Sequence, residues 1–129
     1  MAYIGGIVTG FYLFASAPGI HKKTKWQHLT GWDYAHRGLY DNEHGIPENS
    51  IAAFRRAVDK GYGIELDVHL TADNQLVVFH DDTLTRMCGM NKKISSFLYS
   101  DLMQLRLLGT EEGIPLFKDV LELIDAKCR

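Results

Sequence analysis

The stretch of sequence that decides the fold carries four short motifs between residues 34 and 85: Ala35-His36-Arg37-Gly38, Pro47-Glu48-Asn49-Ser50, Glu65-Leu66-Asp67 and His80-Asp81. The arginine offers a planar set of donors that can hold phosphate oxygens. Two closely spaced carboxylates can bind a hard divalent cation, which prefers oxygen ligands. Two imidazoles can take a proton from a nucleophile and return one to a leaving oxygen. Together the motifs indicate metal-assisted cleavage of a phosphate ester.

The order of these motifs resembles that of the glycerophosphodiester phosphodiesterases, a family that reads H-R-G, P-E-N-[ST], E-x-D, a hydrophobic strand ending in H-D, and L-x-R. This chain has the same motifs in the same order: His36-Arg37-Gly38, Pro47 to Ser50, Glu65 to Asp67, Val77-Val78-Phe79-His80-Asp81 and Leu84-Thr85-Arg86. The resemblance runs from Tyr34 to about Asp125. It implies a (β/α)8 TIM-barrel fold of the α/β class.

A complete barrel of this kind takes about 250 residues, whereas the chain has 129. We therefore expect only the N-terminal half of the barrel. In the family the following strand supplies a further acidic metal ligand and, two positions on, a lysine, and we find neither before Arg129.

The resemblance also implies a role for each polar residue of the motifs. Glu65 and Asp67 would hold Mg²⁺ or Ca²⁺, which polarises a phosphoryl oxygen. Arg37 would neutralise the other phosphate oxygens. His36 and His80 would serve as general base and general acid, in an order that the sequence leaves open.

Three further polar residues have open interpretations. Glu48 either braces the backbone at the end of a strand or reaches the phosphate or the metal. Arg86 either bridges a nearby acidic residue or touches the substrate. His44, in a polar loop, is expected to be a solvated residue rather than a substrate contact.

The implied activity is metal-dependent hydrolysis of a glycerophosphodiester to glycerol 3-phosphate and an alcohol. One alternative keeps the site and changes the substrate to a lysophospholipid, as in a lysophospholipase D. Another, from a different class, is a truncated, non-catalytic, membrane-tethered binding domain. The presence of both histidines argues against it, because a binding domain does not need two acid–base groups.

Composition excludes some functions. Apolar residues make up 46% and charged residues 23% of the chain, as in an ordinary globular protein. The net charge of −2 and the lack of a basic patch with interleaved aromatic residues argue against nucleic acid as a partner. The expected partner is a small-molecule phosphodiester, and the oligomeric state is left open.

Residues 1–20 carry no charged side chain, and about 20 apolar residues are needed to span a bilayer. We therefore expect a membrane anchor at 1–20, a basic juxtamembrane linker at 21–31 and the partial barrel domain at 32–129. Lys22, Lys23 and Lys25 follow the apolar run, which by the positive-inside rule places the domain on the cytoplasmic side. The alternatives are a cleaved signal peptide and a buried or frayed segment of a soluble, cytoplasmic protein.

Local patterns predict the elements that position the motifs. We expect a first strand at Trp32–Ala35 that ends in His36 and Arg37. A helix over residues 51–60 would be capped by Asn49 or Ser50 and end at Gly61. A second strand over 63–68 would turn Glu65 and Asp67 to one side.

The remainder of the chain gives a turn at 71–74 and a strand at 75–79. If the two strands around this turn form an antiparallel hairpin, Glu65 lies roughly opposite His80; if they run parallel, the connection is unusually short. Residues 87–94 are expected to be a surface excursion. Leucine spacing then predicts a helix from Ser100 to Gly109 and another over 116–124.

Overall fold

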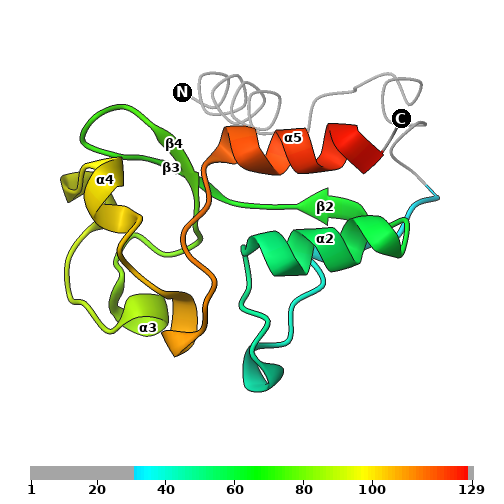
Figure 1. Ribbon diagram of the computed structural model, residues 1–129, viewed down its shortest axis with the longest axis horizontal. Helices are drawn as coiled ribbons and strands as arrows, with labels where there is room; N and C mark the ends of the chain where they lie inside the picture. Colours follow the sequence, from blue (N-terminus) through cyan, green and yellow to red (C-terminus); the bar gives the residue numbers. More distant parts are fainter. Residues whose placement is uncertain (1–30, 128–129) are drawn as a thin grey trace, which may run out of the picture. The chain divides into compact units, whose positions relative to one another are not determined.

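A computed structural model describes residues 31–127 of the chain. All of these residues except Gly31 belong to a compact unit that begins at Trp32 (Figure 1). The predicted anchor at 1–20 and the linker, except for Gly31, lie outside the described residues. Among the helices of residues 31–127, none is long and apolar enough to cross a membrane.

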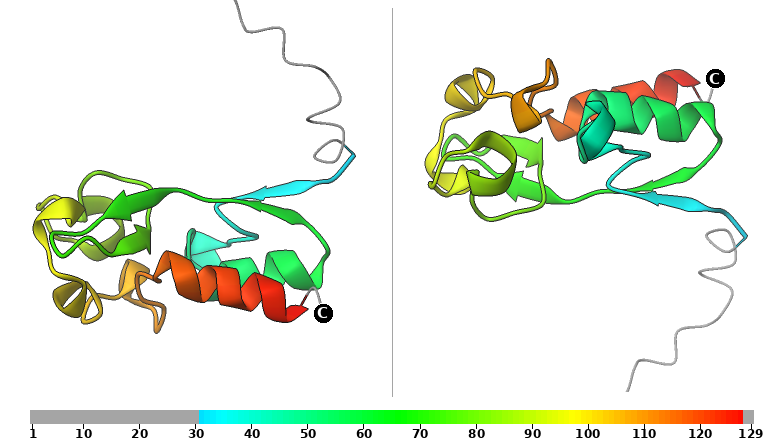
Figure 2. Two further views of the ribbon diagram at one scale, coloured as in Figure 1. Left: turned by 90° about the horizontal axis from the view of Figure 1, so that it is seen from above. Right: turned by 90° about the horizontal axis from the view of Figure 1, so that it is seen from below.

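Two short parallel strands form the part of the fold that carries the first motifs. β1 (Tyr34–His36) pairs with β2 (Gly63–Glu65), and this register sets His36 beside Glu65. Figure 2 shows β1, in cyan, alongside β2. The connection between them contains the helix α2 (Ile51–Asp59), as expected for strands that must cross over to run parallel.

The local signals for α2 are confirmed. The Ser50 side chain caps the helix by accepting a hydrogen bond from the Ala53 amide at 3.1 Å. The helix ends at Asp59, and Gly61 follows in a left-handed conformation. Of the two candidate caps, Ser50 is therefore the one used, which leaves the Asn49 side chain available for another contact.

The second predicted strand is in fact two strands, because the chain changes pairing partner at residues 66 and 67. β3 (Val68–Leu70) does not continue the pairing of β2 and instead pairs with β4 (Leu76–Val78) in an antiparallel hairpin. The hairpin alternative is thus confirmed. Its last contact joins the Phe79 amide to the Asp67 carbonyl at 3.0 Å, so His80 lies one position further along, opposite Leu66 rather than Glu65.

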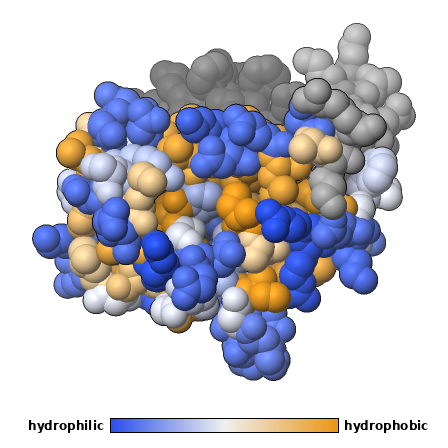
Figure 3. All heavy atoms as spheres, in the orientation of Figure 1, coloured by the Kyte–Doolittle hydropathy of each residue, from blue (hydrophilic) through white to orange (hydrophobic). Residues whose placement is uncertain are grey.

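Two apolar clusters hold these elements. In the first, Phe54 of α2, Val78 of β4 and Val120 of α5 (Phe117–Lys127) are fully buried. The two views of Figure 2 show α2 and α5 on the same side of β1 and β2. Figure 3 shows hydrophobic residues gathered in the band between these two helices, with hydrophilic residues on their outer sides. This packing fixes α2, and with it the motif that precedes the helix.

The second cluster lies beyond β4 and includes residues that sequence patterns placed at the surface. Four short helical elements surround it: α3 (Thr85–Cys88), η4 (Ile94–Ser96), α4 (Tyr99–Leu102) and η5 (Leu107–Gly109). Met87 and Ile94, predicted to bound a surface excursion, are 3% and 1% exposed and pack in this core. That prediction was wrong, because Ile94 is anchored by its amide to the Asp82 carbonyl.

The predicted helix from Ser100 to Gly109 was also wrong. α4 ends at Leu102, and Leu108 has a left-handed φ of 51°. The Leu107 amide donates to the Glu112 carbonyl, a contact from outside the helix, so Leu107 is buried and Leu108 is exposed. The predicted last helix is present, but it begins at Phe117, and Leu121 on it is 49% exposed.

Candidate active site

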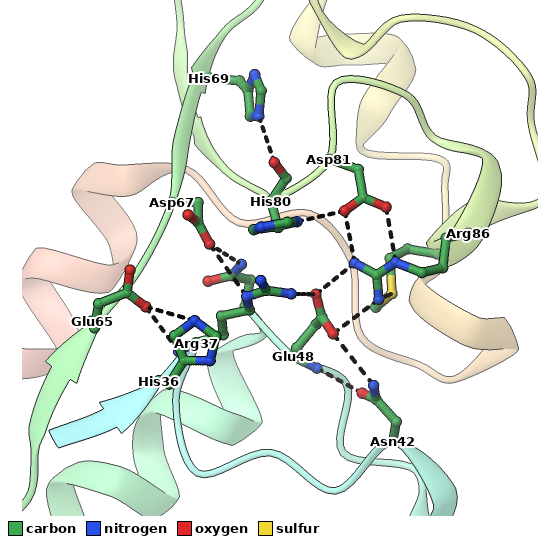
Figure 4. A network of polar contacts seen from close by, with 12 residues as sticks. His36, Arg37, Asn42, Glu48, Glu65, Asp67, His69, His80, Asp81 and Arg86 are labelled. Carbon is green, nitrogen blue, oxygen red and sulfur yellow. Dashed lines mark hydrogen bonds and ion pairs between the residues drawn. The ribbon is translucent and has the colours of Figure 1, made fainter.

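The six site residues predicted from the sequence lie close together (Figure 4). Glu48 precedes α2, and the other five lie at or just after the carboxyl ends of β1, β2 and β4. His36 ends β1, Glu65 ends β2, and His80 follows β4 by two positions. In barrel-type α/β enzymes, catalytic groups occupy the carboxyl ends of parallel strands. The chain therefore brings its polar residues together at the edge of the sheet where such enzymes carry their sites.

The backbone at Arg37 is held in an unusual conformation. Arg37 has a left-handed φ of 57°, which is uncommon for a residue other than glycine. The Arg37 amide donates to the Glu65 carbonyl at 2.9 Å, and the Arg37 carbonyl accepts from the Asn49 amide at 2.9 Å. These bonds pin Arg37 between β2 and the start of α2. Strain of this kind concentrates at functional sites, where the surroundings enforce it.

The Arg37 side chain is partly engaged. Its Nη1 donates to Glu48 Oε1 at 2.9 Å, and its Nε lies 3.6 Å from Asp67 Oδ2, which is an ion-pair contact but too long for a hydrogen bond. Its Nη2 contacts no other residue within the described part of the chain by hydrogen bond or ion pair. The side chain is 17% exposed. Arg37 thus keeps donors that can bind an anion.

Glu48 is the buried carboxylate of the site, with 5% of its side chain exposed. Its oxygens accept from Arg37 and, in a two-point contact at 2.7 and 2.9 Å, from Arg86; Asn42 Nδ2 lies at 3.4 Å. Burial raises the pKa of Glu48, but the hydrogen bonds from Arg86 and Arg37 outweigh it and leave the pKa below its usual value. These four contacts use the lone-pair positions of the carboxylate.

His80 and His36 are held to different degrees. The His80 Nδ1 lies 2.6 Å from Asp81 Oδ1, a direct hydrogen bond, and the His80 carbonyl is contacted by His69 Nε2 at 3.1 Å. The His36 Nε2 lies 3.7 Å from Glu65 Oε2, and its side chain is 65% exposed. His80 is therefore oriented by its neighbours, whereas His36 is only loosely placed.

Asp81 in turn is held by Arg86, whose Nε and Nη2 donate to its two oxygens at 2.9 Å. The hydrogen bonds from Arg86 lower the pKa of Asp81 from 3.8 to about 2, so this carboxyl is ionised at neutral pH. Of the two interpretations of Arg86, the structure supports the one in which Arg86 bridges acidic residues, here Asp81 and Glu48.

Glu65 and Asp67 have the chemistry expected of cation ligands. Both are partly exposed, at 48% and 30% of their side chains. Within the described chain, Glu65 Oε1 and Asp67 Oδ1 make no hydrogen bond or ion pair. Residues 31–127 contain no cluster of three His, Cys, Asp or Glu side chains that could hold a metal. By its chemistry the pair fits a hard cation as two of its ligands.

Four residues of the network had no predicted role in the site: Asn42, Asn49, His69 and Asp81. Asn49 Nδ2 lies 3.3 Å from Asp67 Oδ2, and its buried Oδ1 has no hydrogen-bond partner among the described residues. Asp81 directly follows His80, and this adjacency was the sequence signal that could have indicated its contact with the His80 ring. His44 pairs with Asp41 in its own loop at 2.9 Å and is 77% exposed.

Two parallel strands joined by a helix, with an arginine, two histidines and two carboxylates near the ends of β1, β2 and β4, form an arrangement that is typical of α/β enzymes of the barrel type. Residues 36–128 match the model of the glycerophosphoryl diester phosphodiesterase family. The chain belongs to this family.

Two relatives illustrate the similarity. A glycerophosphodiester phosphodiesterase of Caldanaerobacter subterraneus is 41% identical over 72% of this chain and 40% of its own length. Lysophospholipase D GDPD1 of Rattus norvegicus is 32% identical over 95% of this chain and 42% of its own length. The chain therefore spans about two fifths of the length of these relatives.

Solved structures agree. An Oleispira antarctica phosphodiesterase, in complex with the product sn-glycerol-3-phosphate, superposes with a TM-score of 0.67 at 30% identity, over 78% of this chain and 42% of the other. A glycerophosphodiester phosphodiesterase from Parabacteroides distasonis gives a TM-score of 0.62 at 38% identity, over 74% of this chain and 38% of the other. These neighbours are TIM-barrel enzymes, and the described residues form a mixed α/β part of that fold.

Proposed function

We propose that this chain contributes to the metal-dependent hydrolysis of glycerophosphodiesters to glycerol 3-phosphate and an alcohol. The observation that carries the proposal is the position of Arg37. Its guanidinium lies between the buried Glu48 and Asp67 and retains unused donors. The product named with the Oleispira antarctica structure, sn-glycerol-3-phosphate, supports a phosphodiester as the substrate class.

In this mechanism Arg37 binds the non-bridging oxygens of the phosphodiester and offsets the charge that they gain in the transition state. One imidazole accepts the proton of the nucleophile, which is water or the substrate's own glycerol hydroxyl, and the other returns a proton to the departing alcohol oxygen. The roles fall to His36 and His80. If the glycerol hydroxyl attacks, water opens the resulting cyclic phosphate in a second step to give glycerol 3-phosphate. Glu65 and Asp67 would hold the divalent cation, which supplies Lewis-acid polarisation of a phosphoryl oxygen when bound.

Glu48 has a supporting role in this proposal. Its lone pairs are already occupied by Arg37, Arg86 and Asn42. It therefore orients the phosphate-binding Arg37 and does not bind the metal.

A lysophospholipid substrate is the second candidate. It is favoured by the lysophospholipase D of Rattus norvegicus, whose similarity covers 95% of this chain. The two candidates share the phosphate chemistry and differ in the group esterified to glycerol, so they are distinguished by turnover of glycerophosphocholine against lysophosphatidylcholine.

The test is to incubate the purified chain with each of these substrates in the presence of Ca²⁺, of Mg²⁺ and of a chelator. The assay measures the choline released from both. Release that requires a metal supports a phosphodiesterase, and the faster substrate decides between the two candidates. A folded chain that releases no choline from either substrate is either a fragment that lacks part of the site or a non-catalytic binding domain.

A further inference from the structure

Arg86 stands out because every N–H of its guanidinium is already used. Nε and Nη2 donate to the two oxygens of Asp81, both at 2.9 Å. Nη2 and Nη1 donate to the two oxygens of Glu48 at 2.7 and 2.9 Å, and Nη1 also lies 3.1 Å from the sulfur of Met87. An arginine has five N–H donors. Arg86 therefore has none left for a substrate, although its side chain is 43% exposed.

Arg37 differs in this respect. It shares Glu48 with Arg86 but makes a single side-chain hydrogen bond, through Nη1. Of the two guanidinium groups on Glu48, only that of Arg37 can gain a phosphate without losing a partner. The arrangement thus separates a ligand-binding arginine from an arginine that holds its neighbours (Figure 4).

The contact with Asp81 determines which nitrogen of His80 carries a proton. Asp81 Oδ1 accepts from Arg86 Nη2 and lies 2.6 Å from His80 Nδ1. An ionised carboxylate can only accept hydrogen bonds, so Nδ1 must be the protonated nitrogen. In the neutral ring, Nε2 is then an unprotonated acceptor. His69, which donates through Nε2 to the His80 carbonyl at 3.1 Å, holds the backbone of the same residue.

We propose that Arg86 is a positioning residue that acts in two directions. Through Asp81 it keeps His80 in the Nδ1–H tautomer with Nε2 directed away from the carboxylate, and through Glu48 it orients the guanidinium of Arg37. One guanidinium thereby sets the geometry of both the proton-transfer group and the phosphate-binding group. The catalytic part of this inference rests on the proposed function, whereas the tautomer of His80 does not.

The primary test is spectroscopic. In the full chain labelled with ¹⁵N-histidine, the two ring nitrogens of His80, assigned with the His80→Gln variant, report the tautomer directly. We expect the native chain to show a protonated Nδ1. Arg86→Gln removes the charge and both two-point contacts, so the His80 signals should move toward a mixture of tautomers. Arg55→Gln, at an exposed position of α2, should leave them unchanged. A pure Nδ1–H form in Arg86→Gln would overturn the proposal.

Asp81→Asn provides the second variant and keeps the test decisive if Arg86→Gln does not fold. An asparagine can donate an N–H to His80 Nδ1 and so favour the wrong tautomer. We expect kcat for glycerophosphocholine to fall by about 10- to 100-fold with KM little changed. This magnitude is typical of losing a residue that orients another residue of the site through a hydrogen bond. An unchanged tautomer and kcat would refute the role of Asp81. If the native chain shows no turnover, the proposed function fails, while the tautomer still decides on Arg86.

Discussion

Arg86 and Glu48, 38 positions apart in the sequence, form a two-point ion pair in which Nη2 lies 2.7 Å from Oε1 and Nη1 lies 2.9 Å from Oε2. Glu48 is buried and Arg86 is partly exposed. A buried carboxylate loses its hydration, and this loss must be offset by the hydrogen bonds and charges around it. The pair therefore ties the segment before α2 to the segment after β4, and both segments contribute residues to the site.

The first prediction concerns the stability contributed by this pair. Glu48→Gln leaves the guanidinium of Arg37 beside a neutral amide, and Arg86 loses one of its two carboxylates. We expect a loss of about 3 kcal/mol in the free energy of unfolding, by analogy with broken buried ion pairs, measured by urea denaturation. Glu111→Gln, at an exposed position, is the matched control and should change the stability little. A loss equal to that of the control would mean that the pair contributes nothing.

The second prediction concerns acid unfolding. Because the pKa of Asp81 is lowered from 3.8 to about 2 in the folded chain, the unfolded chain takes up a proton on this carboxyl first as the pH falls. The stabilising contribution is complete above about pH 4 and is lost as the pH drops toward 2, by up to about 2 kcal/mol. Asp81→Asn should flatten the pH dependence of unfolding in this window. Asp82→Asn, at an exposed neighbour, should keep the native slope; equal slopes in all three proteins would contradict the assignment.

The third prediction concerns the glycine after the strained Arg37. Gly38 has a φ of +80°, and a Cβ there would lie 2.9 Å from the carbonyl carbon and the Cβ of Ala53. Gly38→Ala combines left-handed strain with a clash against α2, so we expect a loss of about 3 kcal/mol in unfolding free energy.

Gly45→Ala is the matched control for this substitution, because Gly45 has a similar φ of +77° and open space around its Cβ position. Gly45→Ala introduces the left-handed strain without a clash and should lower the free energy of unfolding by about 1 kcal/mol. Denaturant titrations of both variants separate the two effects. Equal losses of unfolding free energy in the two variants would show that the structure around Ala53 shifts to accommodate the added methyl group.

The sequence allowed the residues that the structure brings together to be picked out, because their motifs are local and their chemistry is specific, whereas their roles stay predictions. Helix α2 was also predictable, since its cap at Ser50 and its stop at Gly61 are local signals. The bridge made by Arg86 was not, because Glu48 lies 38 positions away and either partner could have served another role. The end of α4 was not predicted for the same reason. The Leu107 amide donates to the Glu112 carbonyl, outside the helix, and the spacing of the leucines cannot predict that contact.

The fourth prediction concerns the two imidazoles. His36→Ala and His80→Ala should each fold like the native chain, since both side chains are at least 40% exposed. Each should lose about 10²- to 10⁴-fold in kcat for glycerophosphocholine, the usual contribution of an acid–base group. Far-UV circular dichroism checks the fold, and choline release checks the rate. His44→Ala, whose ring pairs with Asp41 in its own loop, should retain activity. A fully active double variant of His36 and His80 would refute the acid–base roles.

The last prediction concerns the cation proposed for Glu65 and Asp67. Each carboxylate keeps one oxygen without a hydrogen bond or ion pair inside the described chain, so each can supply one ligand to a hard cation. Glu65→Gln and Asp67→Asn should each weaken Ca²⁺ or Mg²⁺ binding about tenfold or more, measured by titration calorimetry, because a neutral amide oxygen replaces a charged ligand. Asp82→Asn keeps the net charge of these variants and should bind as the native chain does. Equal weakening in all three would indicate general charge attraction, and binding unaffected by either substitution would place the cation elsewhere.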